Sequence, residues 1–274
     1  MRNIVFVGGG NMASAILSGL IRQGHPVAAL YVVEPDEAQR ARLRQELGVS
    51  SSAEADESLA SADMLVWAVK PQSFEAAARA CAAHVGQALH LSVMAGIRTE
   101  SILQATGARR VVRAMPNTPA LIGHGVAGLY AGPEVDAQQR RWVEDVLAAT
   151  GATLWVDRES DLDAVTAVSG SGPAYVFYFI EAMMQAAQEM GLNAAQARSL
   201  ALGTFAGASA LAQASQEPPS VLRERVTSKG GTTHTALQRL DANGVKPAFI
   251  AAIKAAQQRA RELGDEFGQP GAKT

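Results

Sequence analysis

Cysteine is nearly absent from this chain of 274 residues, and histidines are few and scattered. The single cysteine, Cys81, cannot form a disulfide within the chain, and its alanine-rich, helical surroundings predict a buried, unreactive thiol. The five histidines show neither HxxxH nor HxH spacing, and cysteine cannot supply a metal site. We therefore expect a fold held together by its apolar core, without a metal-binding site.

Long apolar runs and an excess of charge of one sign are absent as well. The longest apolar run, residues 174–180, ends at Glu181 and is much shorter than a membrane-spanning helix. The net charge of −2 provides no positive field that would attract nucleic acid or an anionic membrane. An expected strand begins at Ile4, which leaves no room for a signal peptide. We expect a cytoplasmic protein whose partner is a small molecule, with neither nucleic acid nor membrane as a partner.

Hydrophobic residues make up 48% of the chain and charged residues 18%, which is typical of a folded globular protein. In the first part, apolar runs alternate with helical stretches: strands are expected at residues 4–7, 30–34, 63–69, 89–94, 110–114 and 152–156, and helices at residues 11–23, 36–47, 73–83, 101–105 and 136–149. Because the apolar runs are continuous, they predict a parallel sheet buried on both faces. The alternation predicts a doubly wound α/β domain of Rossmann type.

The character of the sequence changes after Asp157. From residue 160 onward the chain is rich in alanine, and helices are expected at residues 175–190, 194–214, 219–226, 233–241 and 246–267. We expect two domains: a dinucleotide-binding Rossmann domain at residues 1–157 and an all-helical domain for substrate binding and dimerisation at residues 158–274. The small residues Ala206, Gly207, Ala208 and Ala210 allow helices to approach closely, either in a core within the chain or in a dimer interface.

The sequence GGGNMA directly follows the first expected strand. It places Gly8, Gly10 and Ala13 in the pattern G-x-G-x-x-G/A: the first permits a tight turn, the second lets the backbone approach a pyrophosphate, and the third lets the helix pack closely. Asn11 and Met12 begin the helix, whose N-terminal N–H groups and dipole favour phosphates. The alternative is an ordinary strand–turn–helix connection without a ligand. The flanking strand and apolar helix favour dinucleotide binding.

The second expected strand ends at Glu34, where an acidic residue binds the ribose 2′-hydroxyl of NAD and repels the 2′-phosphate of NADP. Arg40 and Arg42 on the following helix could still reach a 2′-phosphate. Glu34 is otherwise read as an ordinary acid near a helix N-terminus. The sequence leaves the choice between NADH and NADPH open, with NADH somewhat favoured by Glu34.

Three further loops follow expected strands, and the carboxyl ends of such strands carry ligand sites. The first contains Ala68, Lys70 and Pro71, the second contains Ala95, and the third contains Asn117 between two prolines. Each loop alone is read as an ordinary turn. Because all three would lie at the same sheet edge as the glycine loop, together they predict contact with the cofactor.

Two segments of the second half carry polar and glycine residues before expected helices. Residues 166–174 include three small polar residues, two glycines and a proline, which suits either a helix cap or a set of donors for a ligand. Gly230 and Gly231 expose consecutive backbone N–H groups, and Thr232 and Thr233 add hydroxyls, so this segment predicts a cradle for a carboxylate or phosphate. The alternative is a flexible interhelical turn. No nucleophile with its base is evident, and hydride transfer to a C=N bond needs none when the substrate binds as an iminium.

These motifs occur together in one known family. The chain resembles pyrroline-5-carboxylate reductases from end to end, with GGGNMA at residues 8–13, AVKPQ at 68–72, RAMPNTPA at 113–120, AVTAVSGSGPAYVF at 164–177 and VTSKGGTTHTAL at 226–237. The resemblance implies reduction of (S)-1-pyrroline-5-carboxylate to L-proline by NADPH or NADH, the last step of proline biosynthesis. It also implies a Rossmann domain followed by a helical domain that dimerises through interleaving helices, giving a homodimer or a ring of dimers.

The resemblance also implies roles for single residues. Thr166 and Thr233 are the expected catalytic residues: Thr166 would lie near the imine nitrogen, and Thr233 would give both its N–H and its hydroxyl to the substrate. The substrate carboxylate would be held by Ser228, Gly230, Gly231, Thr232 and Thr233, and the cofactor would be lined by Ala68, Lys70, Pro71, Ala95 and Asn117. NADPH-preferring members often have small polar or basic residues where this chain has Glu34. The alternatives are a reductase of another small cyclic imine or 2-oxo acid, and a dinucleotide-binding sensor without turnover.

Overall fold

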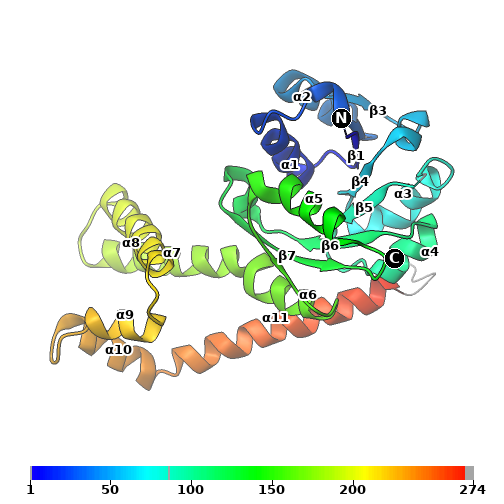
Figure 1. Cartoon of the computed structure of the whole chain (residues 1–274). Helices are drawn as coiled ribbons and strands as arrows, with labels where there is room; N and C mark the ends of the chain where they lie inside the picture. The colour runs from blue at the N-terminus through cyan, green and yellow to red at the C-terminus, as the bar shows by residue number, and fades with distance from the viewer. Residues whose placement is uncertain (1, 86, 269–274) are drawn as a thin grey trace. The chain divides into compact units, whose positions relative to one another are not determined.

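The computed structural model describes residues 2–85 and 87–268, and it contains two compact units (Figure 1). Of these residues, 2–85, 87–171 and 256–268 form the sheet unit, and Gly172–Ala255 form the helical unit. The chain therefore passes from the sheet unit to the helical unit after Ser171 and returns to the sheet unit after Ala255. The domain boundary predicted from the sequence lies after residue 157 and stays a prediction.

The sheet unit is built on an eight-stranded sheet in the order β3-β2-β1-β4-β5-β6-β7-β8. Its strands are β1 Ile4–Val7, β2 Leu30–Val33, β3 Ser50–Ser52, β4 Met64–Trp67, β5 Leu89–Ser92, β6 Val111–Met115, β7 Gly125–Ala131 and β8 Gly151–Trp155. Neighbouring strands are parallel except for the antiparallel pair β6 and β7. The first six follow the Rossmann order, and this confirms the predicted doubly wound α/β class.

Helices cover both faces of this sheet because the side chains of each strand alternate between two cores (Figure 1). Ile4 and Phe6 of β1 pack with α1, α2 and α5, whereas Val5 and Val7 pack with α3 and α4. The helices are α1 Asn11–Arg22, α2 Glu37–Leu47, α3 Phe74–Cys81, α4 Thr99–Thr106, α5 Ala137–Leu147 and α6 Asp161–Val165. Short helical turns lie at η1 Val27–Ala29, η2 Glu57–Ser61, η3 Pro71–Ser73, η4 Thr118–Ile122, η5 Ala148–Thr150 and η6 Thr166–Gly170.

Two strands were not expected from the sequence. β3 consists of three serines and lies at the edge of the sheet, so its pairing with β2 does not depend on an apolar run. β7 contains two glycines, which are poor strand formers, and it runs antiparallel to β6. The sheet is therefore parallel as predicted except where the unexpected strand β7 pairs with β6. Cys81 is buried, as predicted, and burial raises the pKa of its thiol to about 11.

The helical unit contains only helices, as predicted. They are α7 Gly172–Glu189, α8 Ala194–Ala214, α9 Pro219–Arg225, α10 Thr232–Ala242 and the first part of α11 Val245–Gly268. α7 packs against α8, and the ring of Phe249 lies edge-on to Tyr175 and Phe179, with centroids 5.7 and 5.4 Å apart. The small residues proposed to let helices approach, Ala206, Gly207, Ala208 and Ala210, are all exposed. They form no core within the chain.

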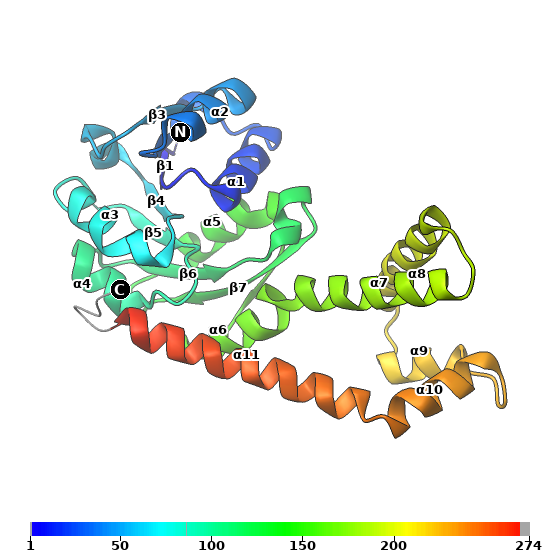
Figure 2. The same cartoon turned by 180° about the vertical axis from the view of Figure 1, so that it is seen from behind.

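The last part of α11, residues 256–268, returns to the sheet unit. Figure 2 shows this end of the helix beside α4. Phe267 packs against the core that contains Val5 and Val7. A Cβ placed on Gly96 would lie 3.0 Å from the ring of Phe267. Arg98 donates to the carboxylate of Asp265 at 2.6 Å. Among the residues that the structure describes, no helix combines the length and apolar content needed to cross a bilayer.

Candidate functional site

The glycine loop between β1 and α1 is shaped by one close approach. Gly8 has a positive φ of +96°, and a Cβ at this position would lie 2.7 Å from the carbonyl oxygen of Ala68. Only glycine fits there without strain. The structure thus brings two of the predicted cofactor segments, the glycine loop and the loop after β4, into direct contact.

The N-terminus of α1 is open to an anion. Gly10 is its N-cap residue and provides no side-chain cap, the first turn has no acidic residue, and a Cβ on Gly10 would meet nothing within 4 Å. Asn11 is exposed, Met12 is half-buried, and Ala13 is completely buried against the sheet. Free N–H groups at the positive end of a helix dipole bind phosphates. The start of α1 is therefore suited to an anion, and pyrophosphate binding by these residues stays a prediction.

Glu34 holds this loop in place, a role that the sequence did not predict. Its carboxylate accepts a hydrogen bond from the backbone N–H of Gly9 at 2.7 Å and another from Asp36 N–H at 2.9 Å. Gln39 donates from its side-chain amide to the Gly9 carbonyl at 2.5 Å. The side chain of Glu34 therefore links the glycine loop, the end of β2 and the start of α2.

Arg40 and Arg42, the two candidate cations for a 2′-phosphate, differ in their surroundings. Arg40 donates through Nη1 to the carbonyl oxygens of Glu34 and Pro35 at 2.8 and 2.7 Å, which places its guanidinium at the end of β2. Arg42 instead pairs with Glu46 one turn further along α2, at 3.0 Å. The structure thus brings Arg40, but not Arg42, beside Glu34.

The loops after β4 and β5 lie at the carboxyl edge of the sheet. The Ala68 N–H donates to Val7 O at 2.8 Å, which continues the pairing of β4 with β1 up to the glycine loop. Lys70 is exposed and precedes the short turn that begins at Pro71. Ala95 is exposed in the loop between β5 and α4. Lys70 and Ala95 are therefore both accessible from this edge.

Asn117 connects two segments at the same edge. Its side chain is buried, its Oδ1 accepts from the Val126 N–H at 2.9 Å, and its Nδ2 donates to the Ser169 carbonyl at 3.2 Å. The amide therefore joins the start of β7 to the wide turn after α6. Contact between Asn117 and a cofactor stays a prediction.

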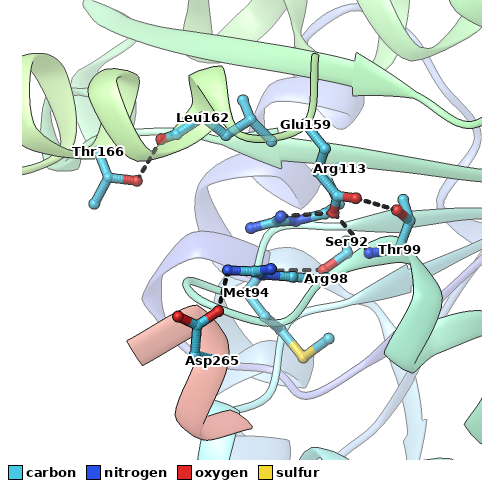
Figure 3. Close-up of polar contacts among 9 residues, drawn as sticks. All are labelled: Ser92, Met94, Arg98, Thr99, Arg113, Glu159, Leu162, Thr166 and Asp265. Atoms are coloured by element: carbon cyan, nitrogen blue, oxygen red, sulfur yellow. Dashed lines mark hydrogen bonds and ion pairs between the residues drawn. The ribbon is translucent and has the colours of Figure 1, made fainter. Parts of the chain in front are cut away.

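Thr166 begins the wide turn η6, in which Ser171 N–H bonds back to the Thr166 carbonyl at 2.8 Å. Such π-type turns are frequent at functional sites. The Thr166 hydroxyl donates to the carbonyl of Leu162 at 2.7 Å (Figure 3). Its hydrogen is therefore engaged within the helix, while its oxygen keeps its capacity to accept a hydrogen bond.

A buried ion pair lies beside these segments, and the sequence did not predict it. Arg113 of β6 donates to Glu159 at 2.7 Å, and the Thr99 backbone N–H and hydroxyl donate to the same carboxylate (Figure 3). Burial alone would raise the pKa of Glu159, but Arg113 and the Thr99 hydrogen bonds together lower it below its usual value. Burial raises the pKa of Asp163, against the opposing charges of Arg113, Arg98 and Arg261.

The predicted carboxylate cradle lies in the helical unit, immediately before α10. Gly230 has a φ of +75°, and the Gly231 N–H donates to the Ser228 carbonyl at 3.0 Å. A Cβ on Gly231 would lie only 2.5 Å from Ser228 Oγ, so the Ser228 side chain would have to rotate to admit another residue there. The positive φ of Gly230 is the feature of this turn that favours glycine. α10 begins at Thr232 with no side-chain cap and no acidic residue in its first turn, which includes Thr233. Its first N–H groups are available to an anion.

Two hollows of the sheet unit lie away from these segments. One of about 490 Å³ is lined by Arg2, Ile4, His25 and Trp142, among others, and one of about 430 Å³ extends around Asp63 and Arg110. Both lie at the amino ends of the strands, and no predicted site residue lines them. Within residues 2–85 and 87–268, no group of three His, Cys, Asp or Glu residues is placed to hold a metal ion.

A Rossmann sheet with an open glycine loop, followed by a helical region, defines the class of dinucleotide-dependent oxidoreductases. Residues 3–96 match the family described as NADP oxidoreductase, coenzyme F420-dependent, and residues 159–263 match pyrroline-5-carboxylate reductase dimerisation. The pyrroline-5-carboxylate reductase of Pseudomonas aeruginosa is 42% identical over 97% of this chain and 98% of its own length. The chain belongs to the pyrroline-5-carboxylate reductase family.

Solved structures agree with this assignment. A pyrroline-5-carboxylate reductase from Coxiella burnetii is 35% identical, with a TM-score of 0.90 over 96% of this chain and 98% of that one. A pyrroline carboxylate reductase from Plasmodium falciparum, solved with NADP bound, is 26% identical, with a TM-score of 0.86 over the same shares. The similarity covers both units of the chain.

Proposed function

We propose that this protein reduces (S)-1-pyrroline-5-carboxylate to L-proline with NADPH or NADH, as the last step of proline biosynthesis. The observation that carries the proposal is the 42% identity, over nearly the full length of both chains, to a pyrroline-5-carboxylate reductase. Two uncapped helix N-termini, those of α1 and α10, support it, because this reaction needs one site for a dinucleotide phosphate and one for a substrate carboxylate.

The dinucleotide fits the residues of the sheet unit. The positive φ of Gly8 and the open space above Gly10 form a cradle that a side chain would fill. Gly8, Gly10, Asn11, Met12 and Ala13 would hold the pyrophosphate, Glu34 and Arg40 would lie at the adenosine ribose, and Ala68, Lys70, Pro71, Ala95 and Asn117 would line the remainder. When bound, the reduced nicotinamide supplies the hydride that reduces the C=N bond of the imine.

The substrate would be oriented at both of its polar ends. The N–H groups at the start of α10, with the hydroxyls of Ser228, Thr232 and Thr233, would hold the carboxylate. Because Thr166 gives its hydroxyl hydrogen to Leu162 O, its oxygen is left to accept the N–H of a protonated imine. Thr166 would therefore bind the iminium form, which is the form that accepts a hydride.

The helical unit supports the proposal of a homo-oligomer. Residues 159–263 match a dimerisation family, and Phe177, Tyr178 and Leu211 are 60%, 69% and 59% exposed within the chain. Exposed apolar residues of this size mark an interaction surface. A homodimer with interleaved helices, or a ring of such dimers, would cover them. A small-molecule substrate, no nucleic-acid partner and a cytoplasmic location complete the proposal.

The proposed function is tested by following the oxidation of NADPH and NADH by absorbance, with and without pyrroline-5-carboxylate. Loss of the reduced cofactor only in the presence of the imine is the expected result. A faster reaction with a six-membered cyclic imine would assign the protein to a related reductase, and cofactor binding without oxidation would identify a sensor. Growth of a proline auxotroph that lacks its own reductase, after the gene is introduced, would place the reaction in proline synthesis.

A further inference from the structure

The carboxylate of Glu159 is the meeting point of three segments that are distant in sequence. One oxygen accepts from the Thr99 N–H and from Arg113 Nη1, each at 2.7 Å, and the other accepts from the Thr99 hydroxyl. The side chains of Arg113 and Glu159 are only 8% and 23% exposed. Both oxygens are therefore engaged, and bonds of this charge-assisted kind fix distance and direction closely.

Each of the three segments leads directly to a residue of the proposed site. Thr99 is the first residue of α4 and ends the loop that contains Ala95. Arg113 lies in β6, which runs on into the loop of Asn117. The Glu159 carbonyl accepts from Leu162 N–H at 3.0 Å at the start of α6, which continues into the turn of Thr166. Figure 3 shows Arg113 and Thr99 meeting at the carboxylate of Glu159.

The charged residues near Glu159 do not make the same contacts with Thr99 and Arg113. Arg98 lies close by, but its guanidinium pairs with Asp265 at 2.6 Å. Asp163 has a raised pKa and forms no ion pair within the described residues. α4 has no side-chain cap from its own N-cap residue, Arg98, so the carboxylate of Glu159 is what satisfies the Thr99 N–H.

We infer that Glu159 is a positioning residue for the proposed reduction. Through its bonds to Thr99 and Arg113, Glu159 fixes the position of the loop of Ala95 relative to the turn of Thr166. The nicotinamide and the imine would then be held at reacting distance. This inference rests on the proposed function. It differs from a simple stabilising ion pair because it predicts that loosening this contact slows turnover in protein that remains folded.

The test compares Glu159→Gln with Glu75→Gln, which removes an exposed carboxylate that pairs with Arg79 on α3. We expect Glu159→Gln to lower kcat by roughly 10- to 100-fold, because a displacement of about 1 Å at a reacting centre has effects of this size. The Kd for NADPH, titrated without imine, should rise less than threefold, because the pyrophosphate loop is untouched. Peptides covering residues 94–100 should exchange backbone hydrogens faster. Glu75→Gln should change none of these values.

A second pair of variants covers the case in which Glu159→Gln does not fold. Thr99→Val removes one donor to Glu159 and keeps the ion pair with Arg113, whereas Thr99→Ser keeps the donor. We expect Thr99→Val to have a lower kcat and faster hydrogen exchange at residues 94–100 than the wild type. Thr99→Ser should keep the wild-type values of both. Unchanged kcat and exchange in folded Glu159→Gln or Thr99→Val, with only a lower melting temperature, would overturn the inference. If the wild type does not reduce the imine, the proposed function fails, while hydrogen exchange and NADPH binding still test the contact.

Discussion

The sheet unit and the helical unit differ in how many large apolar side chains they bury. The sheet unit covers both faces of its sheet and encloses two cores of large side chains, such as Phe6 and Trp67. In the helical unit, the buried hydrophobic residues are Ile180 and three alanines, Ala187, Ala197 and Ala201. The comparison teaches that the sheet unit can be stable by itself, whereas the helical unit needs a further surface to cover its apolar side chains.

The two proposed anion sites also lie in different units. The open helix N-terminus of the sheet unit is suited to a dinucleotide, and that of the helical unit is suited to a substrate carboxylate. Substitutions at the first site should therefore affect cofactor binding, and those at the start of α10 should affect binding of the substrate carboxylate. Four experiments test the differences between the two units.

The largest effect is expected from a charge on the apolar surface of the helical unit. Phe177→Glu should leave the single chain folded, because the side chain is 60% exposed there, but it would place an unpaired charge in the proposed interface. The dissociation constant of the assembly should rise at least 100-fold, as burying an uncompensated charge costs about 3 kcal/mol or more. Sedimentation at several concentrations measures it. The control is Leu154→Glu, an exposed position of the sheet unit; equal weakening by both variants would contradict the comparison.

Acid should weaken the sheet unit through His90. This residue is fully buried, its Nδ1 accepts from Trp67 Nε1 at 3.1 Å, and burial, with the charge of Arg110, lowers its pKa to about 4. The ring stays neutral in the folded state, whereas it binds a proton in the unfolded chain below a pKa of about 6.5. The free energy of unfolding should therefore be highest above pH 6.5 and should fall by roughly 3 kcal/mol as the pH falls toward 4.

Urea unfolding between pH 7 and pH 4 checks this prediction, with His90→Gln as the variant whose stability should depend less on pH. Hydrogen exchange should show loosening in the sheet unit first, because the histidine of the helical unit, His234, is half-exposed. Equal pH dependence of the wild type and His90→Gln would exclude His90 as the cause.

A smaller and more specific effect is expected at the start of α10. Thr233→Ala removes a hydrogen bond to the substrate carboxylate, so KM for the imine should rise by roughly 10- to 100-fold, or about 1.5–3 kcal/mol. The Kd for NADPH should not change. Thr235→Ala is the matched control, because the Thr235 hydroxyl donates within the helix to Gly231 O at 3.2 Å. An unchanged KM in Thr233→Ala would refute the carboxylate cradle.

The smallest effect concerns the choice of cofactor. Arg40→Ala should lower kcat/KM with NADPH by about 3- to 10-fold and leave NADH nearly unaffected, because its guanidinium lies beside Glu34, where a 2′-phosphate would bind. Arg42→Ala, whose partner is Glu46, should change neither. Equal losses with both cofactors would show that Arg40 only supports the loop.

Much of the fold could be predicted because its signals are local. Continuous apolar runs such as residues 64–67, and the caps Asp36 and Gly48 of α2, depend on neighbours in sequence. β3 and β7 were missed because serine and glycine carry no such signal, and their places come from pairing with β2 and β6. The glycine loop was predicted for the same local reason, since its turn and helix are adjacent.

The arrangement around Glu159 could not be predicted in this way. Its partners, Thr99 and Arg113, lie 60 and 46 residues away, and a single carboxylate carries no pattern that identifies them. The same holds for Asn117, whose amide joins residues on two other segments. Sequence motifs predict residues that would bind a ligand, whereas the side chains that align those residues emerge only from tertiary contacts.

The return of α11 to the sheet unit has a consequence for the order of synthesis. Residues 2–171 leave the ribosome first and contain every strand of the sheet, but Asp265 and Phe267, which contact Arg98 and Gly96, are made last. The loop of Ala95 therefore gains its final cover only after the whole helical unit has been translated. A chain truncated before the last part of α11 would contain all eight strands but would lack the contacts of Asp265 and Phe267 with this loop.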